Sequence, residues 1–113
     1  MRLERGDVYW TEFDPAVGCE MGKTRPAVVV QNDGGNRISP TTIVVTVTSR
    51  LLGLHYPFVV WIPDGVLPKA SVVNCAHIRT VDKVRIKPGR IAHLDEATMA
   101  RVDDALRASL GLR

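Results

Sequence analysis

The chain has 113 residues and a mass of 12.4 kDa, so we expect a single domain over residues 1–113, with no room for a second core of ordinary size. The composition, 45% apolar and 24% charged, is that of a globular protein and excludes a disordered chain. The 15 Lys and Arg residues against 12 Asp and Glu give a net charge of +3, which favours a polyanion or an acidic protein as partner without requiring either.

The first part of the chain predicts two strands joined by a flexible loop. Residues 7–13 are rich in aromatic and β-branched side chains, and the strand stops at an Asp-Pro pair that cannot extend a ladder. The loop over residues 16–24 contains two glycines as its flexible points. Residues 26–31 are apolar enough to form a second strand that is buried on both faces.

The middle of the chain predicts a loop followed by a hairpin. Residues 32–36 are dense in turn-forming Asn, Asp and Gly, and we expect the loop to continue to Pro40. Residues 42–49 are nearly all β-branched and carry the clearest strand pattern in the sequence. A hairpin loop over residues 50–55 then leads to a return strand over residues 56–62.

The last part of the chain predicts two short strands, residues 71–75 and 78–81, with a kink between them, and then a helix. Asp95 suits the N-cap of this helix, Leu94 the preceding staple position, and Gly111 a left-handed C-cap. The apolar residues that recur at helical spacing are Met99, Val102, Leu106 and Leu110. We expect most of this stripe to lie in the core, with a contact surface between two copies of the chain as the alternative role.

Five or more short strands with one terminal helix indicate a mostly β (α+β) fold, a small partly open barrel with the helix packed against it. The longest apolar runs span only a few residues, so no transmembrane helix is expected. Residues 1–7 carry four charged side chains and no apolar run, so no signal peptide is expected either. We therefore expect a cytoplasmic protein without a membrane partner.

The sequence contains no pattern typical of a metal or cofactor site. Cys19 and Cys75 lie far apart with no Cys or His at metal-binding spacing, and Cys75 suits a small buried apolar residue. The acidic residues form no cluster of the kind that binds Mg²⁺. Spacing does not pair any two of His55, His77 and His93 for acid–base cleavage.

The first candidate residues for phosphate binding lie in the segment Gly22-Lys23-Thr24-Arg25-Pro26. A glycine-containing loop delivers two cations here, and the proline favours an extended backbone at the residue before it. The Arg25 guanidinium therefore projects from the mouth of a strand, where its planar charged fork suits a phosphate. By itself the segment also fits an ordinary surface arginine.

The second candidate group lies at the end of the strand over residues 42–49. Alternation places Thr46 and Thr48 on one face, and Thr48 with Ser49 ends the strand, where hydroxyl groups can meet a ligand. Arg50 adds a cation directly after them. The preference of threonine for strands would explain these residues without any ligand.

Blocks spread along the whole chain carry a resemblance to one family. The first are Arg5-Gly-Asp-Val-Tyr-Trp10, Asp14-Pro15 and Gly18-x-Glu20-x-Gly22-x-x-Arg25-Pro26. The later ones are Gln31-Asn-Asp33, Asn36, Val45-Thr-Val-Thr-Ser49, Ser71-Val-Val73, Ile78-Arg-Thr-Val-Asp-Lys83 and Val102-Asp-x-Ala-Leu-x-x-Ser-Leu-Gly-Leu112. In this order and with these spacings the chain resembles the MazF/PemK toxins of bacterial toxin–antitoxin systems.

The resemblance implies an SH3-like barrel of the MazF/PemK/CcdB type with a C-terminal helix. Members of the family are metal-independent, ribosome-independent endoribonucleases that cut single-stranded RNA, often mRNA, at short motifs. They form homodimers and are neutralised by a MazE-like antitoxin whose acidic, partly disordered C-terminal tail wraps the dimer. No cofactor is implied.

The resemblance also assigns roles to residues. The catalytic arginine and threonine of the family fall on Arg25 and Thr48, and its RNA-loop glutamate falls on Glu20. Cleavage would leave a 2′,3′-cyclic phosphate and a 5′-hydroxyl, with Arg25 holding charge on the phosphate and Ser49 assisting Thr48. The other expected RNA contacts are Lys23, Arg50 and Arg79 on phosphates, with Asn32, Asn36 and His77 on bases.

One substituted position, the two aromatic residues of the first strand and the function itself each allow more than one interpretation. His77 stands where the family usually has Gln. Tyr9 and Trp10 are candidate stacking platforms, but an edge strand turns half of its side chains inward, so neither is included in the site. Two alternative functions are a CcdB-like toxin that binds gyrase and a barrel that only binds single-stranded nucleic acid, although 5% aromatic residues is little for the latter.

Overall fold

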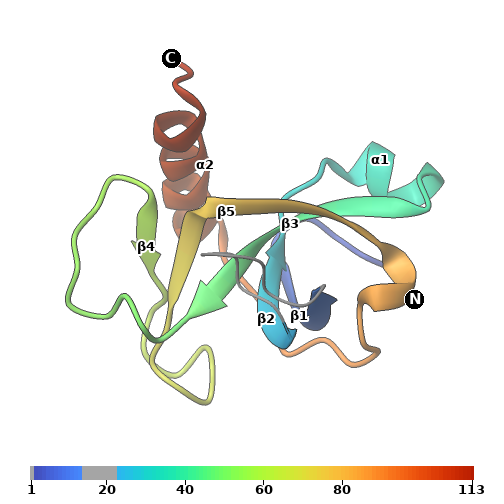
Figure 1. The fold of residues 1–113 in the computed structure, drawn as a ribbon, viewed down its shortest axis with the longest axis horizontal. Coiled ribbons are helices and arrows are strands. Elements are labelled where there is room, and N and C mark those ends of the chain that lie inside the picture. Colours follow the sequence, from blue (N-terminus) through green and yellow to red (C-terminus); the bar gives the residue numbers. More distant parts are fainter. Residues whose placement is uncertain (1, 14–22) are drawn as a thin grey trace.

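A computed structural model describes residues 2–13 and 23–113, in which a curved sheet of six strands is packed against a C-terminal helix (Figure 1). The strands are β1 (Asp7–Phe13), β2 (Lys23–Val29), β3 (Thr41–Thr48), β4 (Val59–Trp61), β5 (Val72–Asp82) and β6 (Ala92–His93). The helices are α1 (Asp33–Ile38), the 3₁₀ turn η1 (Lys83–Arg85) and α2 (Glu96–Leu110).

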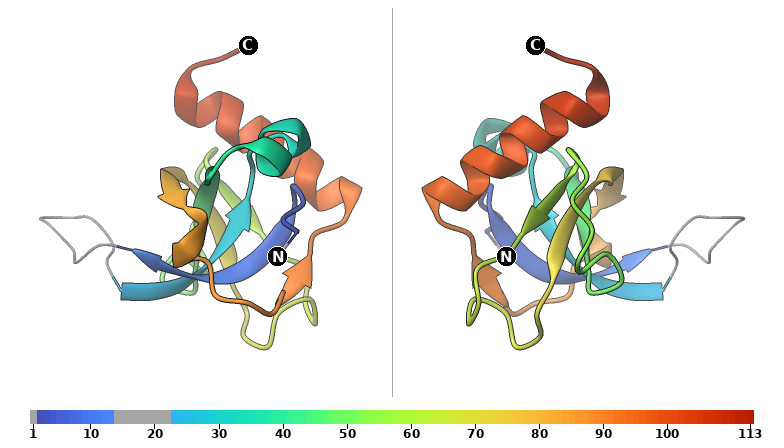
Figure 2. Two further views of the ribbon diagram at one scale, coloured as in Figure 1. Left: turned by 90° about the vertical axis from the view of Figure 1, so that its right-hand side faces the viewer. Right: turned by 90° about the vertical axis from the view of Figure 1, so that its left-hand side faces the viewer.

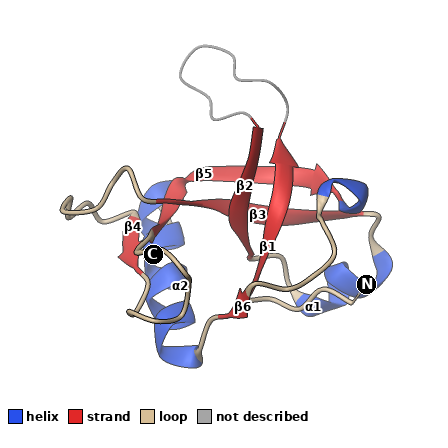
Figure 3. Ribbon diagram, turned by 90° about the horizontal axis from the view of Figure 1, so that it is seen from below, coloured by secondary structure: helices blue, strands red, loops and turns tan. Residues whose placement is uncertain are grey.

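The sheet order is β4-β5-β3-β2-β1-β6, and all its strand pairs are antiparallel. Figure 3 shows the β1–β2 pair crossing β3 and β5 at a steep angle, so the sheet curls strongly along its length. The two end strands, β4 and β6, leave the barrel partly open. The predicted mostly β, partly open barrel with a C-terminal helix is confirmed.

The central strands have apolar side chains on both faces because each face covers a separate core. Val28 and Val45 pack with the α2 residue Val102 in one core. Ala27 and Val44, their neighbours along the same strands, belong to a second core on the other side. The prediction that the second strand is buried on both faces is therefore confirmed, although that strand begins three residues earlier than expected, at Lys23.

Pro26 lies inside β2 without breaking it because β2 has only one partner there. It is opposite Trp10 of β1, and the ladder between β2 and β3 begins one residue later, at Ala27. A missing backbone N–H is tolerated at such a one-sided position.

The kink predicted after residue 75 is confirmed, but the two predicted strands are one. In β5, Asn74 pairs with Thr46 and Ile78 pairs with Val45, so residues 75–77 have no partner of their own in β3. This bulge bends the strand, as Figure 1 shows.

Three expectations about elements were wrong. Residues 56–62 form a strand only over β4, and this strand pairs with β5 rather than with β3, so the hairpin predicted between residues 42–49 and 56–62 is absent from the described sheet. The third difference is α1, which replaces part of the loop expected after residue 31, and the short strand β6 is an additional element. The helix forms because the Asn32 side-chain oxygen accepts a hydrogen bond from the Gly35 N–H at 2.7 Å and so caps its N-terminus. Residues typical of turns are also typical of helix N-caps, so the local pattern does not separate the two.

The C-terminal helix α2 lies across the barrel (Figure 2) with the predicted caps. Asp95 is the N-cap, and Gly111 closes the helix in the left-handed conformation at φ 70°. Leu94 and Met99 pack in the same core, as a hydrophobic staple requires. Met99 and Val102 of the predicted apolar stripe are buried and Leu106 packs against the same core, whereas Leu110 is exposed, so most of the stripe lies in the core as expected. No helix of the described chain is long and apolar enough to span a membrane.

The N-cap predicts an acid-dependent loss of stability. The Asp95 carboxylate accepts a hydrogen bond from the Thr98 N–H at 2.8 Å, and this bond, followed by one from the Thr98 side chain, holds the pKa of Asp95 below its ordinary value of 3.8. Because the folded-state pKa is lowered, this contribution to stability is complete above pH 3.8 and is lost as the pH falls through the lower folded value. We expect the free energy of unfolding, measured by urea titration, to depend less on pH in that range for Asp95→Asn than for the wild type. Equal changes in the free energy of unfolding with pH in the two proteins would contradict this.

Candidate functional site

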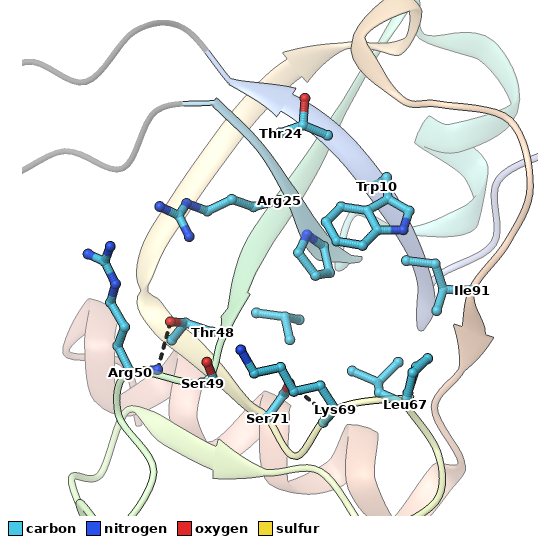
Figure 4. A pocket seen from close by; sticks show the side chains of 13 residues that line it. Trp10, Thr24, Arg25, Thr48, Ser49, Arg50, Leu67, Lys69, Ser71 and Ile91 are labelled. Atoms are coloured by element: carbon cyan, nitrogen blue, oxygen red, sulfur yellow. Dashed lines mark hydrogen bonds between the residues drawn. The ribbon is translucent and has the colours of Figure 1, made fainter.

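A pocket of about 380 Å³ opens between the ends of β2 and β3 (Figure 4). Its walls come from β1, β2, the end of β3, the loop before β5 and the segment before β6. The lining residues are Trp10, Thr24, Arg25, Pro26, Val47, Thr48, Ser49, Arg50, Leu67, Pro68, Lys69, Ser71 and Ile91. Segments distant in the sequence therefore share one concave surface.

Sheet register brings the two expected catalytic residues to the same place. The ladder between β2 and β3 ends at the pair Ala27–Thr46, and extending the same register by two residues would place Arg25 opposite Thr48. Residues two apart on a strand lie on the same face, so both side chains occupy the face that carries Ala27 and Thr46. Both line the pocket, and Figure 4 shows them on the same side of it.

The turn after β3 fixes the orientation of the threonine hydroxyl. Thr48 Oγ1 accepts a hydrogen bond from the Arg50 backbone N–H at 3.1 Å. A hydroxyl is both donor and acceptor, so its own hydrogen is left to be donated to a ligand oxygen. The same turn places Ser49 and the Arg50 side chain at the pocket.

The charges that line the pocket are all positive. Arg25, Arg50 and Lys69 are the ionisable side chains among its lining residues, with no carboxylate and no histidine among them in the described part of the chain. The hydroxyl groups of Thr48 and Ser49 lie among these cations, while the Ser71 hydroxyl donates its hydrogen to the Lys69 backbone carbonyl. Cations and hydroxyl donors together are suited to a phosphate group. Within residues 2–13 and 23–113 no group of three or more His, Cys, Asp or Glu could hold a metal ion.

One wall of the pocket is apolar, and it contains a residue that the sequence analysis left out. Trp10 is 47% exposed and lines the pocket beside Pro26, its partner in the β1–β2 ladder. Tyr9, on the opposite face of the strand, is buried in the second core. The alternation in β1 separates these two aromatics, but it does not say which of the two faces becomes interior.

The asparagines expected to bind bases are used inside the fold. Asn36 is 4% exposed; its amide donates to the Gln31 carbonyl at 3.0 Å and accepts from the Thr42 hydroxyl at 2.7 Å. The Asn36 side chain thus joins α1 to β3, and no described contact supports its expected role at a base, which stays a prediction. Asn32 uses its side-chain oxygen as the α1 cap. Neither residue lines the pocket.

The remaining expected RNA contacts lie elsewhere. Lys23 is exposed at the start of β2, His77 lies in the β5 bulge, and the Arg79 guanidinium lies 5.4 Å from the centre of the Phe13 ring. None of the three lines the pocket, and Glu20 falls outside the described residues. These four roles stay predictions.

Cys75 does not contribute a nucleophile. The side chain is buried in the first core, where desolvation, followed by the charge of Asp103, raises the pKa of the thiol to about 12. A thiol in this state is protonated at neutral pH and unreactive. The expected packing of Cys75 as a small apolar residue is confirmed.

Comparisons with known proteins agree on one family. A family described as PemK-like, MazF-like toxin of type II toxin–antitoxin system matches residues 4–110. The chain is 43% identical over 114 residues to endoribonuclease EndoA of Bacillus subtilis (strain 168), covering 99% of this chain and 97% of that protein.

Solved structures show the same fold. MazF (Form-I) from Deinococcus radiodurans is 28% identical, with a TM-score of 0.84 over 99% of each chain. A MazE–MazF complex (Form-II) from the same organism contains a chain that is 30% identical, with a TM-score of 0.79 over 100% of this chain and 99% of that one.

Proposed function

The chain belongs to the PemK/MazF family of toxins of type II toxin–antitoxin systems and is an endoribonuclease, and on this premise we propose that it cuts single-stranded RNA at short sequence motifs without a metal ion or the ribosome. The products are a 2′,3′-cyclic phosphate and a 5′-hydroxyl. The observation that carries the proposal is the pocket of about 380 Å³ that Arg25 and Thr48 line together with further cations and hydroxyl groups.

The reaction is an internal transfer at phosphorus. The 2′-oxygen attacks the phosphorus and loses its proton, while the bond to the 5′-oxygen breaks and that oxygen gains a proton. Atoms and charge therefore balance, and no water molecule is consumed when these products form. The phosphorane carries more negative charge than the substrate, so fixed cations and hydrogen-bond donors around it lower the barrier.

Arg25 is the principal clamp for this charge. Its guanidinium is planar and permanently charged and can hold two phosphate oxygens at once. Thr48 donates its hydroxyl hydrogen to the scissile phosphate, because the Arg50 N–H already occupies an acceptor position of that oxygen. Ser49 assists from the adjacent position on the pocket wall.

Substrate binding extends beyond the pocket. Arg50 at its rim, with Lys23 and Arg79 further away, holds phosphates, while Asn32, His77 and Glu20 are proposed to contact the nucleotide bases. Sequence-specific RNA recognition uses splayed single-stranded bases that side chains reach by hydrogen bonding and stacking. Asn36 is not included, because its amide is buried and bonded inside the fold.

We further propose that a MazE-like antitoxin neutralises the protein through an acidic C-terminal tail. A net charge of +3 favours rapid association with an acidic partner. A relative from Deinococcus radiodurans has been solved as a MazE–MazF complex, and another as an endoribonuclease with its cognate antitoxin from Mycobacterial species.

A homodimer is proposed as the active form. The edge strand β4 exposes Trp61, and a groove of about 510 Å³ lies between β4 and α2. Tyr56, in the loop before β4, is also exposed. Large apolar side chains gathered at one sheet edge are typical of a surface that another chain covers.

The test is incubation of purified, antitoxin-free protein with mixed-sequence single-stranded RNA in EDTA, followed by mapping of the cut ends. We expect cuts at a recurring short motif that leave 5′-hydroxyl ends. Absence of cleavage by the folded protein would reject the proposal and favour a gyrase-binding assay instead. Cleavage only after addition of Mg²⁺ would reject the metal-free reaction alone.

A further inference from the structure

Lys69 is a third cation at the pocket, although nothing in its local sequence marks it. It lies in the loop between β4 and β5, between Pro68 and Ala70. Figure 4 shows its ammonium group directed toward Thr48 and Ser49 rather than away from the pocket. Arg25, Arg50 and Lys69 thus come from three separate segments to one space.

The loop that carries Lys69 is held in position. The Ser71 hydroxyl donates a hydrogen bond to the Lys69 backbone carbonyl at 2.9 Å, and Ser71 begins the segment that enters β5. Pro68, which precedes the lysine, restricts the backbone on the other side. The backbone of Lys69 is therefore anchored while its side chain extends over the pocket.

The ammonium group of Lys69 differs from those of two other lysines in having no partner among the residues that the structure describes. Lys83 donates to the Asn36 carbonyl, and Lys87 pairs with Glu12 at 2.7 Å. Lys69 makes no hydrogen bond or ion pair through its ammonium group with residues 2–13 or 23–113. A cation placed beside two arginines without a carboxylate is stabilised when an anion enters the space between them.

We propose that Lys69 is a catalytic residue that binds the scissile phosphate opposite Arg25 and stabilises the charge of the phosphorane. The inference rests on the proposed function, because it assigns a role in the same cleavage reaction. Lys69 is a compact charge with three rotatable donors, whereas Arg25 is a rigid fork. The two therefore complement each other: Arg25 fixes the phosphate, and Lys69 follows the oxygens as their charge increases.

The test compares Lys69→Gln and Lys69→Arg with the wild type and with Lys87→Gln, which removes the same charge outside the pocket. Two quantities are measured: kcat on a short RNA that contains one mapped cleavage motif, and Kd for the same oligonucleotide with a 2′-deoxy residue at the cut site, which cannot react. Thermal unfolding checks that each variant is folded.

We expect Lys69→Gln to lower kcat by about 10²-fold, the order found for one donor to a developing oxyanion, and to weaken Kd several-fold. Lys69→Arg should recover part of the lost kcat. The kcat and Kd of Lys87→Gln should stay within about threefold of the wild-type values, since exposed charges away from the site act weakly. A Lys69→Gln variant with the kcat and Kd of Lys87→Gln would overturn the inference.

The two proposals fail in different ways. If the wild type does not cut RNA, the proposed nuclease function is rejected, and the Kd for the 2′-deoxy oligonucleotide decides the question about Lys69. Weaker binding by Lys69→Gln than by Lys87→Gln would then still support a phosphate-binding lysine, and equal binding would reject it. If the wild type cuts and Lys69→Gln cuts equally well, only the role of Lys69 is rejected.

Discussion

Arg25→Ala is expected to lower the RNA cleavage rate by about 10²–10³-fold, the order found when one preorganised donor to a developing oxyanion is removed. The pocket keeps Arg50 and Lys69, so part of the positive potential survives. The group that the extended sheet register would place opposite Thr48 is lost, however, and with it the two-pronged contact to the phosphate. Arg25 stabilises the transition state, in which charge develops on the phosphate, more than it stabilises the bound substrate. Its removal should therefore lower kcat more than it lowers substrate affinity.

Arg25→Lys separates charge from geometry. A lysine keeps the positive charge but offers a point charge in place of a planar fork, so we expect only partial recovery. Arg107→Ala is the matched control, because Arg107 lies on the exposed side of α2, where it pairs with Asp104. The measurement is single-turnover cleavage of one RNA by all three variants. An Arg25→Ala rate within threefold of the Arg107→Ala rate would contradict the assignment.

Asp7→Ala is expected to lower the free energy of unfolding by about 2–3 kcal/mol, because it removes a buried carboxylate that accepts several hydrogen bonds. Asp7 is 2% exposed. One oxygen accepts from the Glu4 N–H at 2.9 Å, and the other lies 2.7 Å from His93 Nδ1 and 3.4 Å from the Arg90 guanidinium. These contacts join the start of β1 to β6, the strand that leads into α2.

The effect should be smaller than complete loss of a buried ion pair, because His93 and Arg90 are partly exposed and water can solvate them once Asp7 is gone. Asp64→Ala is the control: Asp64 is exposed in the turn after Pro63, away from the groove between β4 and α2, so its removal should change stability by less than about 1 kcal/mol. Urea unfolding measures both. Equal losses in the free energy of unfolding for the Asp7 variant and the control variant would show that burial of the Asp7 carboxylate contributes nothing to stability.

Much of the architecture follows from local patterns in the sequence. The apolar spacing and caps of α2, the β-branched run of β3 and the aromatic run of β1 predict those elements because helix and strand periodicities are properties of the residues themselves. Arg25 and Thr48, which both line the pocket, could be predicted as site residues from the sequence because each lies in a short segment whose pattern and family resemblance are local.

Contacts between distant segments could not be predicted in this way. Lys69 has no special sequence context and reaches the pocket because β5 returns its loop beside β3. Trp10 lines the pocket and Tyr9 lies in a core because the sheet curls toward one face of β1, a choice that alternation leaves open. Asn36, which suits a ligand-binding loop by composition, is buried because α1 folds back onto β3. Residue periodicity thus assigns side chains to faces, and the packing of the barrel determines which faces meet the core and which line the pocket.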